Sequence, residues 1–86
     1  MGFSKGNIIL KLKGILKKMN SFSAVEQLKD EENLFSIGAL DSLVLIQFVL
    51  MIEEEFKIRI DNADISYDHF SNFAKIYEML SLKHKI

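Results

Sequence analysis

The chain has 86 residues, of which 49% are hydrophobic, and its formal net charge is −1. These values suit one small domain over residues 1–86 with an economical core. Because the chain has no cysteine, disulfides, thiolate metal sites and cysteine nucleophiles are excluded. No apolar run approaches the roughly 20 residues of a membrane span, and the N-terminus lacks a signal-peptide pattern. We therefore expect a cytoplasmic protein.

The first expected element is an amphipathic helix over residues 4–19. Its apolar side chains recur at the spacing of one helical stripe, and its lysines occupy the other side. A basic helix can indicate nucleic acid or anionic lipid, but a solvated face of an amphipathic helix is the simpler interpretation. The stripe comprises Ile8, Ile9, Leu12, Ile15, Leu16 and Met19, and the lysines are Lys11, Lys13, Lys17 and Lys18.

A long loop over residues 20–40 is expected next. Ser21 and Ser23 are turn formers, and residues 24–28 are compatible with a short helical turn. Long loops in small domains are usually functional or disordered. Apolar residues in the second half predict that this loop is pinned to the core; they are Leu34, Phe35, Ile37 and Leu40.

A second helix is predicted over residues 42–56, with Asp41 or Ser42 as its N-cap. One side is expected to be buried and carries Leu45, Phe48, Val49, Ile52 and Phe56. Gln47 and Glu54 mark the opposite side. Flanking this polar line, and predicted to be exposed or half-exposed, are Leu43, Val44, Leu50 and Met51. That is an unusual apolar load for a strip that faces solvent.

The last third of the chain predicts a connector and further helices. Ile58 and Ile60 alternate with charged residues, but the chain offers no partner strand, so an extended connector is expected. Asp61 or Asn62 can cap a short turn that follows. A last helix, capped by Ser71 or Asn72, has a shared apolar face of Phe73, Ile76, Tyr77 and Leu80. The expected fold is all-α: a small four-helix bundle with three main helices, one short helix and a long first loop.

Catalysis by Ser42 is not expected. A serine hydroxyl is a poor nucleophile without an activating base, and the two histidines, His69 and His84, lie late in the chain on polar segments. A serine that another enzyme modifies needs no such base. It needs exposure, a fixed backbone and a helix N-terminus that favours a phosphate, and position 42 is expected to supply these.

No metal site is predicted. Three consecutive glutamates, residues 53–55, spread around a helix and cannot converge on one ion. They are expected to form a solvated helix end. Asp61, Asn62 and Asp64 have some character of a calcium loop, but the rest of its 12-residue pattern is absent.

The segment that leads to Ser42 resembles the prosthetic-group segment of acyl carrier proteins. The matching residues are Leu34, Ile37, Gly38, Asp41, Ser42 and Leu43. The family pattern is also matched by the acidic end of the second helix through Phe56, and then by Ile58 and Ile60. Residues 64–65 and 68–70 resemble the third-helix region of stand-alone carriers. The resemblance covers about residues 30–80, and more loosely the first helix.

The resemblance implies a role for each matching residue. Ser42 would bear 4′-phosphopantetheine, whose thiol holds an acyl or aminoacyl group as a thioester. Asp41 would help a transferase position its metal and the serine hydroxyl. Gly38 would permit a sharp approach of the loop with positive φ, and Leu43 would pack near the arm. No residue would be catalytic. The implied partners of this monomer are a phosphopantetheinyl transferase, an acyl- or aminoacyl-loading ligase and a downstream synthase or transferase.

Two features depart from carriers of fatty-acid synthesis. The spacer Ala39-Leu40 before Asp41 resembles that of D-alanyl carrier proteins and of many discrete carriers in specialised pathways. Neutral residues replace the acids of the exposed strip on the second helix, which implies apolar partner recognition, as in peptidyl or aminoacyl carriers. The residues expected to contact partners are Val44, Gln47, Leu50 and Met51.

The sequence leaves open the cargo, the pathway (fatty acid, polyketide, nonribosomal peptide or D-alanylation) and whether an acyl chain enters a groove between the helices. Two other functions also remain open. One is a nucleic-acid-binding module that uses the lysine-rich first helix, although no second helix presents base-reading side chains. The other is a small helical adaptor that uses the apolar strip.

Overall fold

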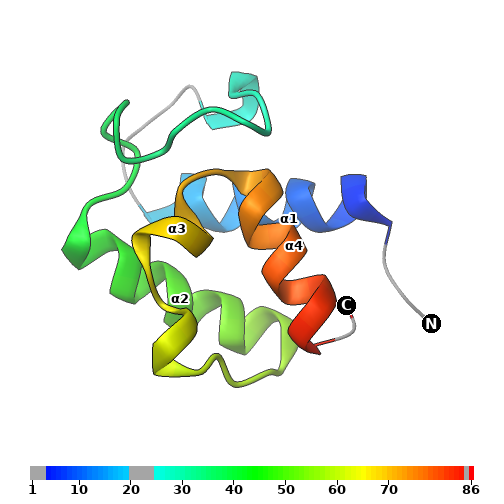
Figure 1. Cartoon of the computed structure of the whole chain (residues 1–86). Coiled ribbons are helices and arrows are strands. Elements are labelled where there is room, and N and C mark those ends of the chain that lie inside the picture. Colours follow the sequence, from blue (N-terminus) through cyan, green and yellow to red (C-terminus); the bar gives the residue numbers. More distant parts are fainter. Residues whose placement is uncertain (1–3, 20–24, 85) are drawn as a thin grey trace.

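The computed structural model describes residues 4–19, 25–84 and 86, and every regular element in those ranges is a helix. The elements are α1 (Lys5–Met19), the 3₁₀ turn η1 (Val25–Gln27), α2 (Ser42–Phe56), the 3₁₀ turn η2 (Asn62–Asp64), α3 (Tyr67–Phe70) and α4 (Phe73–His84). The predicted all-α bundle of three main helices and one short helix is therefore confirmed (Figure 1). In the described parts of the chain, no helix has both the length and the apolar character needed to cross a membrane.

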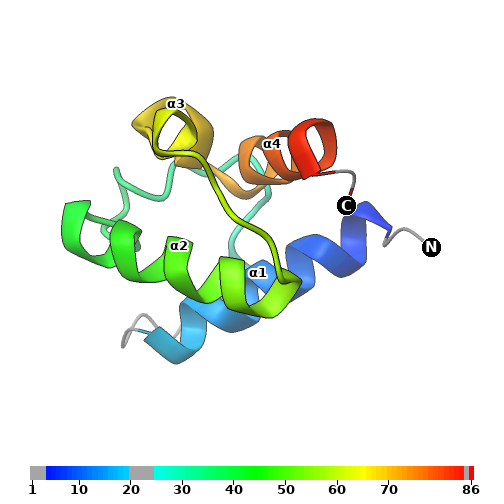
Figure 2. The ribbon, with the colours of Figure 1, turned by 90° about the horizontal axis from the view of Figure 1, so that it is seen from below.

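The bundle has two layers. Figure 2 shows α1 and α2 on one side, and α3 and α4 covering them from the other. Helix α1 packs against α2, α4 and η1, and α3 packs against α4. The long connection between α1 and α2 runs over the edge of the bundle to the start of α2 (Figure 1). Of this connection, the predicted turn formers Ser21 and Ser23 lie outside the described residues.

The core consists of the predicted apolar stripes. Helix α1 buries all of its expected stripe except Met19, which is half-buried. Helix α2 buries Leu45, Phe48, Val49 and Ile52, while Phe56 is half-buried. Helix α4 contributes Phe73, Ile76, Met79 and Leu80. Helical periodicity therefore located the buried faces of α1 and α2 and most of that of α4. On α4, the predicted Tyr77 is only half-buried, and Met79 is buried although it was not predicted.

The first loop is pinned to the core, as its apolar residues predicted. Leu34, Ala39 and Leu40 are buried. The Leu34 amide donates to the Ser71 carbonyl at 2.7 Å, and the Ala74 amide donates to the Asp30 carbonyl at 3.0 Å. These two bonds tie the loop to the start of α4 across a large sequence separation.

Helix α2 ends in a tight turn to which Glu53 contributes twice. Lys57 adopts a left-handed conformation with φ of 56°, and its amide donates to the Glu53 carbonyl. The Ile60 amide donates to Glu53 Oε2 at 2.7 Å. The expectation that residues 53–55 form a solvated helix end was therefore wrong for Glu53, whose half-buried carboxylate satisfies an amide of the extended connector.

The lysines of α1 do not form a uniformly solvated face either. Lys11 pairs with Glu55 of α2 at 3.1 Å. Lys13 donates to the Leu28 carbonyl at 2.8 Å, lies 3.7 Å from Asp30 and has only 14% of its side chain exposed. This side chain spans from α1 to the first loop, so the solvated-face interpretation was wrong for Lys13. Lys17 and Lys18 are exposed, as expected.

Side-chain caps define the later helices. Asn72, one of the two predicted caps of α4, accepts from the Lys75 amide at 2.7 Å. Ser66 caps α3 by accepting from the His69 amide at 3.3 Å. Asp61 precedes η2 without a side-chain capping bond.

Candidate functional site

Asp41 is the N-cap that starts α2, which decides between the two predicted caps. Its backbone is extended, with φ of −138° and ψ of −178°. Its Oδ1 accepts from the Leu43 and Val44 amides at 3.0 and 2.9 Å, so one carboxylate oxygen satisfies two of the unpaired amides at the helix start. Ser42 is consequently the first helical residue, and both Asp41 and Ser42 are exposed.

The surroundings of Ser42 suit a phosphate ester better than a catalytic nucleophile. The first turn of α2 contains no acidic residue, and the helix dipole favours an anion there. The two histidines lie on α3 and α4. His69 Nε2 lies 3.7 Å from the buried Asp64, and His84 is in the last turn of α4, at the opposite end of the molecule from the start of α2 (Figure 1).

Gly38 has the positive φ that the resemblance implied, at 83°. A β-carbon added at this position would meet no atom within 4 Å. The requirement for glycine is therefore conformational and not steric. Its amide donates to the Phe35 carbonyl at 3.2 Å, which closes the turn that redirects the chain towards α2.

The spacer Ala39-Leu40 acts as an anchor. Both side chains are buried, and both amides donate to the Leu34 carbonyl, at 2.9 and 3.0 Å. The two residues immediately before Asp41 are therefore fixed to the core, and the next two project to solvent. The two-residue spacer that departs from the fatty-acid pattern is thus an integral part of the packed structure.

Asn33 joins this loop to α3, a connection that the sequence analysis missed. Its Oδ1 accepts from the Phe35 and Ser36 amides at 3.0 and 2.9 Å. Its Nδ2 donates to Tyr67 Oη at 2.9 Å, and the Phe35 and Tyr67 rings lie 4.8 Å apart. Asn followed three residues later by Ser is a sequence signal for a side-chain-stabilised turn, but the partner on α3 has no local signal.

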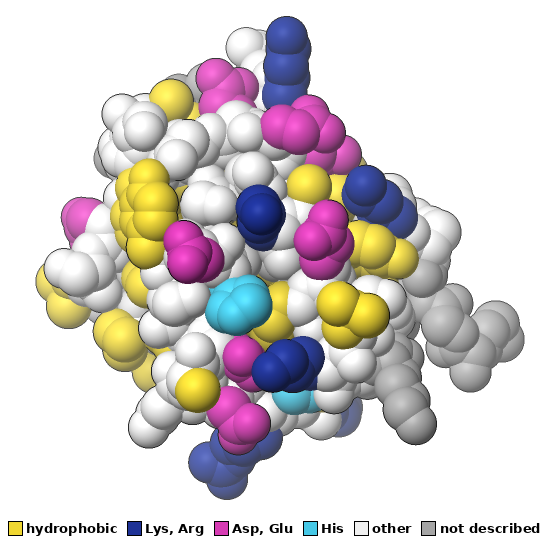
Figure 3. Space-filling view, viewed as in Figure 1, with side chains coloured by type: hydrophobic (Ala, Val, Ile, Leu, Met, Phe, Trp, Pro, Cys, Tyr) yellow, Lys and Arg dark blue, Asp and Glu magenta, His cyan; other side chains and the backbone are white. Residues whose placement is uncertain are grey.

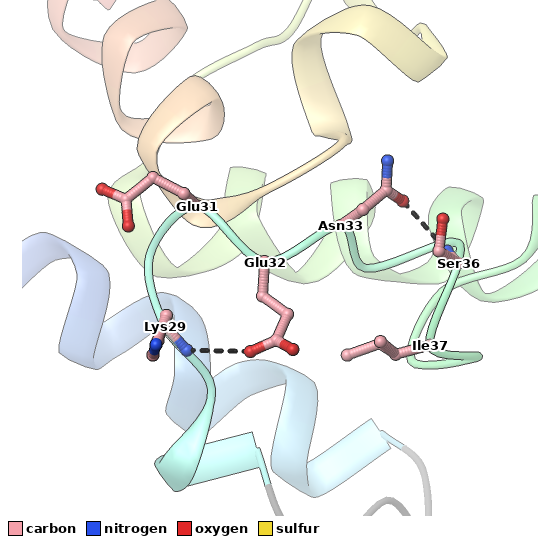
Figure 4. Close-up of a pocket in the computed structure, with 6 residues that line it drawn as sticks. All are labelled: Lys29, Glu31, Glu32, Asn33, Ser36 and Ile37. Atoms are coloured by element: carbon pink, nitrogen blue, oxygen red, sulfur yellow. Dashed lines mark hydrogen bonds between the residues drawn. The ribbon is translucent and has the colours of Figure 1, made fainter.

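A pocket of about 400 Å³ in the same loop is a poor candidate for a ligand site. Figure 4 shows that Glu32 turns back towards the Lys29 amide, and Asn33 towards Ser36. These polar side chains, which line the pocket, are therefore engaged in bonds that stabilise the loop. Within the described ranges, no three His, Cys, Asp or Glu side chains converge closely enough to hold a metal ion.

The side of α2 that faces solvent carries an apolar stripe, defined here as Leu43, Ile46 and Leu50. They are 70%, 50% and 60% exposed, and the spacing i, i+3, i+7 places them in one row that starts beside Ser42. Figure 3 shows hydrophobic side chains at the surface on the side where α2 begins. The exposure of Leu43 and Leu50 was predicted; Ile46 was missed.

The other expected partner residues flank this stripe. Gln47 is exposed and Met51 is 36% exposed. Val44 is half-buried and packs against the core. Its half-burial agrees with the prediction that it is exposed or half-exposed, but because it contacts the core, a charge at this position would disturb the fold as well as the surface.

Comparison with known families identifies the chain. A family model described as a phosphopantetheine attachment site matches residues 11–80. The chain belongs to this family. No match was found among curated proteins or among solved structures.

Membership confirms the resemblance to acyl carrier proteins and makes the domain an attachment site for covalently bound 4′-phosphopantetheine. Domains of this family are typically noncatalytic carriers that interact with modifying and biosynthetic enzymes. The geometry fits such a group, because an exposed hydroxyl stands on a fixed backbone at the start of a 15-residue helix.

Exchanging Gly38 for alanine tests the conformational requirement of the turn. We expect Gly38→Ala to lower the free energy of unfolding by about 1–2 kcal/mol, because an L-residue is strained at positive φ. Gly14→Ala is the matched control. Gly14 lies in the middle of α1, where an added β-carbon would meet no atom within 4 Å, so the exchange should raise stability by about 0.5–1 kcal/mol. Urea denaturation measures both, and equal effects of the two exchanges would contradict the assignment.

Proposed function

We propose that this protein is a noncatalytic carrier in which Ser42 bears the phosphopantetheine arm, and that it shuttles an acyl or aminoacyl thioester between enzymes. The observation that supports this most strongly is the placement of Ser42. It is exposed at the first position of α2, directly after the N-cap Asp41 and the buried pair Ala39-Leu40. The whole chain would act as one monomeric domain.

In this proposal Ser42 is the substrate of a phosphopantetheinyl transferase. The Ser42 oxygen forms a phosphodiester with the phosphopantetheine of coenzyme A, the nucleotide leaves, and the hydroxyl proton passes to a base of the transferase. Asp41 contributes its second carboxylate oxygen, because only Oδ1 is used by the two capping bonds. Once bound, the arm supplies a thiol that a ligase loads and a downstream synthase or transferase unloads.

Partner recognition is proposed to be apolar. The stripe of Leu43, Ile46 and Leu50, flanked by Gln47 and Met51, offers neutral surface beside the serine. Neutral surfaces give little long-range electrostatic steering. This fits a discrete carrier that handles aminoacyl or specialised acyl groups. The cargo, the pathway and the cytoplasmic location remain predictions.

The alternatives differ in how well the structure supports them. A nucleic-acid-binding role for α1 is disfavoured, because Lys11 and Lys13 bind Glu55, the Leu28 carbonyl and Asp30 instead of facing outward together. An adaptor that binds through the apolar stripe is compatible with the same surface as the carrier. Only covalent loading separates those two functions.

The attachment site is tested by loading with coenzyme A and a phosphopantetheinyl transferase. Intact mass spectrometry should show one added phosphopantetheine on the parent and none on Ser42→Ala. Ser36→Ala, an exposed serine in the preceding loop, is the matched control and should load normally. Because Asp41 and not Ser42 is the cap, Ser42→Ala should change stability by no more than about 0.5 kcal/mol. Modification of the alanine variant would refute the assignment.

Asp41 is tested by separating its charge from its capping role. Asparagine is also a good N-cap, so Asp41→Asn should retain the stability of the parent. Loading kcat/KM should fall about tenfold or more, since a contact to a charged group is worth about 1.5–3 kcal/mol. Asp41→Ala should also lose about 1 kcal/mol of stability. If Asp41→Asn loads at the parent rate, Asp41 is only a structural cap.

The partner surface is tested by adding charge and varying salt. Loading kcat/KM of the parent should depend weakly on ionic strength, because screening acts mainly between exposed charges. Leu50→Asp should lower that kcat/KM while the protein stays folded by circular dichroism. Leu10→Asp, at a similarly exposed leucine on α1 (68% against 60%), should not. A steep salt dependence in the parent, or equal losses in both variants, would contradict apolar recognition.

A further inference from the structure

Buried phenylalanine rings of α2 and α3 meet in the core of the bundle. Phe48 of α2, Phe70 of α3 and Phe73 of α4 are all fully buried. The Phe48 and Phe70 rings meet edge to face, with centroids 6.4 Å apart and an interplanar angle of 74°. This pair lies where an acyl chain would have to pass if it entered the bundle between α2 and α3.

Residues of the first loop contact α3 at both of its ends, and these contacts oppose a movement of α3 away from α2. It consists of only four residues, Tyr67–Phe70. At its start, Tyr67 accepts from Asn33 and stacks near Phe35. Directly after its end, the Ser71 carbonyl accepts from the Leu34 amide at 2.7 Å. Opening the bundle at α3 would break these contacts together with the Phe48–Phe70 pair.

We propose that Phe48 and Phe70 are specificity-determining residues that close the bundle to long acyl chains, so that the carrier serves short acyl or aminoacyl groups that stay at the surface. This inference rests on the proposed function, since it assumes cargo on an arm at Ser42. It names the class of cargo, which the attachment site by itself does not.

The surface along α2 offers a groove with both apolar and charged lining. An open groove of about 430 Å³ runs beside α2. It starts at Ile46, about 6 Å along the helix axis from Ser42. Apolar side chains such as Ile46, Leu50 and Ile65 line it together with the charged side chains of Glu53, Arg59 and Asp61. A short or polar group fits such a mixed surface, whereas a long chain would lie beside charged side chains.

The absence of cysteine from the sequence permits a test that needs no transferase. Ser42→Cys provides a single thiol, which iodoacetamide reagents with a pantetheine-length spacer can alkylate. The spacer ends in either an acetyl or an octanoyl group. We expect the two conjugates to differ in Tm by less than about 4 °C, the smallest shift that substantial burial gives in a domain of this size. A Tm of the octanoyl conjugate that exceeds the acetyl value by about 4 °C or more would overturn the proposal.

Removing the Phe70 ring should allow the octanoyl group to enter the core. In Phe70→Ala the octanoyl conjugate should melt about 4–8 °C above the acetyl conjugate, because the chain fills the space that the ring leaves. Phe73→Ala is the matched control. Its ring is equally buried but lies outside the Phe48–Phe70 pair, with Lys13 Nζ 5.6 Å from its centroid. No gain in Phe70→Ala, or an equal gain in Phe73→Ala, would overturn the assignment of Phe70.

Two further measurements keep the test decisive. If Phe70→Ala does not fold, Phe48→Leu and Phe70→Leu provide the same comparison with smaller cavities. In the parent conjugates, NMR should place octanoyl-dependent shifts at Ile46 and Leu50 and leave Phe48 and Phe70 unchanged; shifts of these two ring signals would overturn the barrier.

Failure of this inference is distinguishable from failure of the proposed function. If the native protein gains no phosphopantetheine on Ser42, the carrier function is wrong, but the alkylated conjugates still report whether the bundle is closed. If loading occurs and the octanoyl conjugate is stabilised, the carrier function stands and the aromatic barrier is wrong.

Discussion

The placement of the attachment segment depends on the buried backbone of Leu34. Its carbonyl accepts from two consecutive amides, Ala39 and Leu40, and its own amide donates to Ser71. One residue thereby joins the first loop, the segment that delivers Asp41 to α2, and the junction between α3 and α4. Burial of the Leu34 side chain is worth about 1.5–3 kcal/mol, and each backbone bond adds about 0.5–1.5 kcal/mol net. Without these contacts of Leu34, the turn at Gly38 and the Asp41 cap would not be fixed relative to the core.

A consequence is that the exposed serine contributes little to its own placement. The turn at Gly38, the buried pair Ala39-Leu40 and the Asp41 cap fix the backbone on its N-terminal side, and α2 fixes it on the other. The Ser42 hydroxyl is then free to change chemically without a change in the fold. The proposed role of Ser42 needs this independence, because a carrier domain has to keep the same structure before and after modification.

Features with a local cause were predictable from the sequence. Helical periodicity located the buried faces of α1 and α2 and most of that of α4, and the matching motif indicated positive φ at Gly38. Features that depend on contacts between distant segments could not be predicted from the sequence. The second role of Glu53 requires the position of Ile60 after the turn, and the burial of Lys13 requires the loop carbonyl of Leu28. Local patterns therefore predicted the attachment segment, while its support from α3 through Asn33 and Tyr67 appeared only in three dimensions.

In the proposed carrier, a closed core and an exposed attachment residue both follow from the small surface that the domain can bury. A domain of this size buries only about 60% of its unfolded surface, so the large apolar area of phenylalanine rings is difficult to replace. A bundle that opened to enclose its cargo would give up some of that packing whenever it was empty. Its stability would also vary with the cargo, since any group that binds only the native state stabilises it by mass action. Under the proposed function, rings that fill the bundle would make the fold independent of loading, and recognition would depend on the surface of α2.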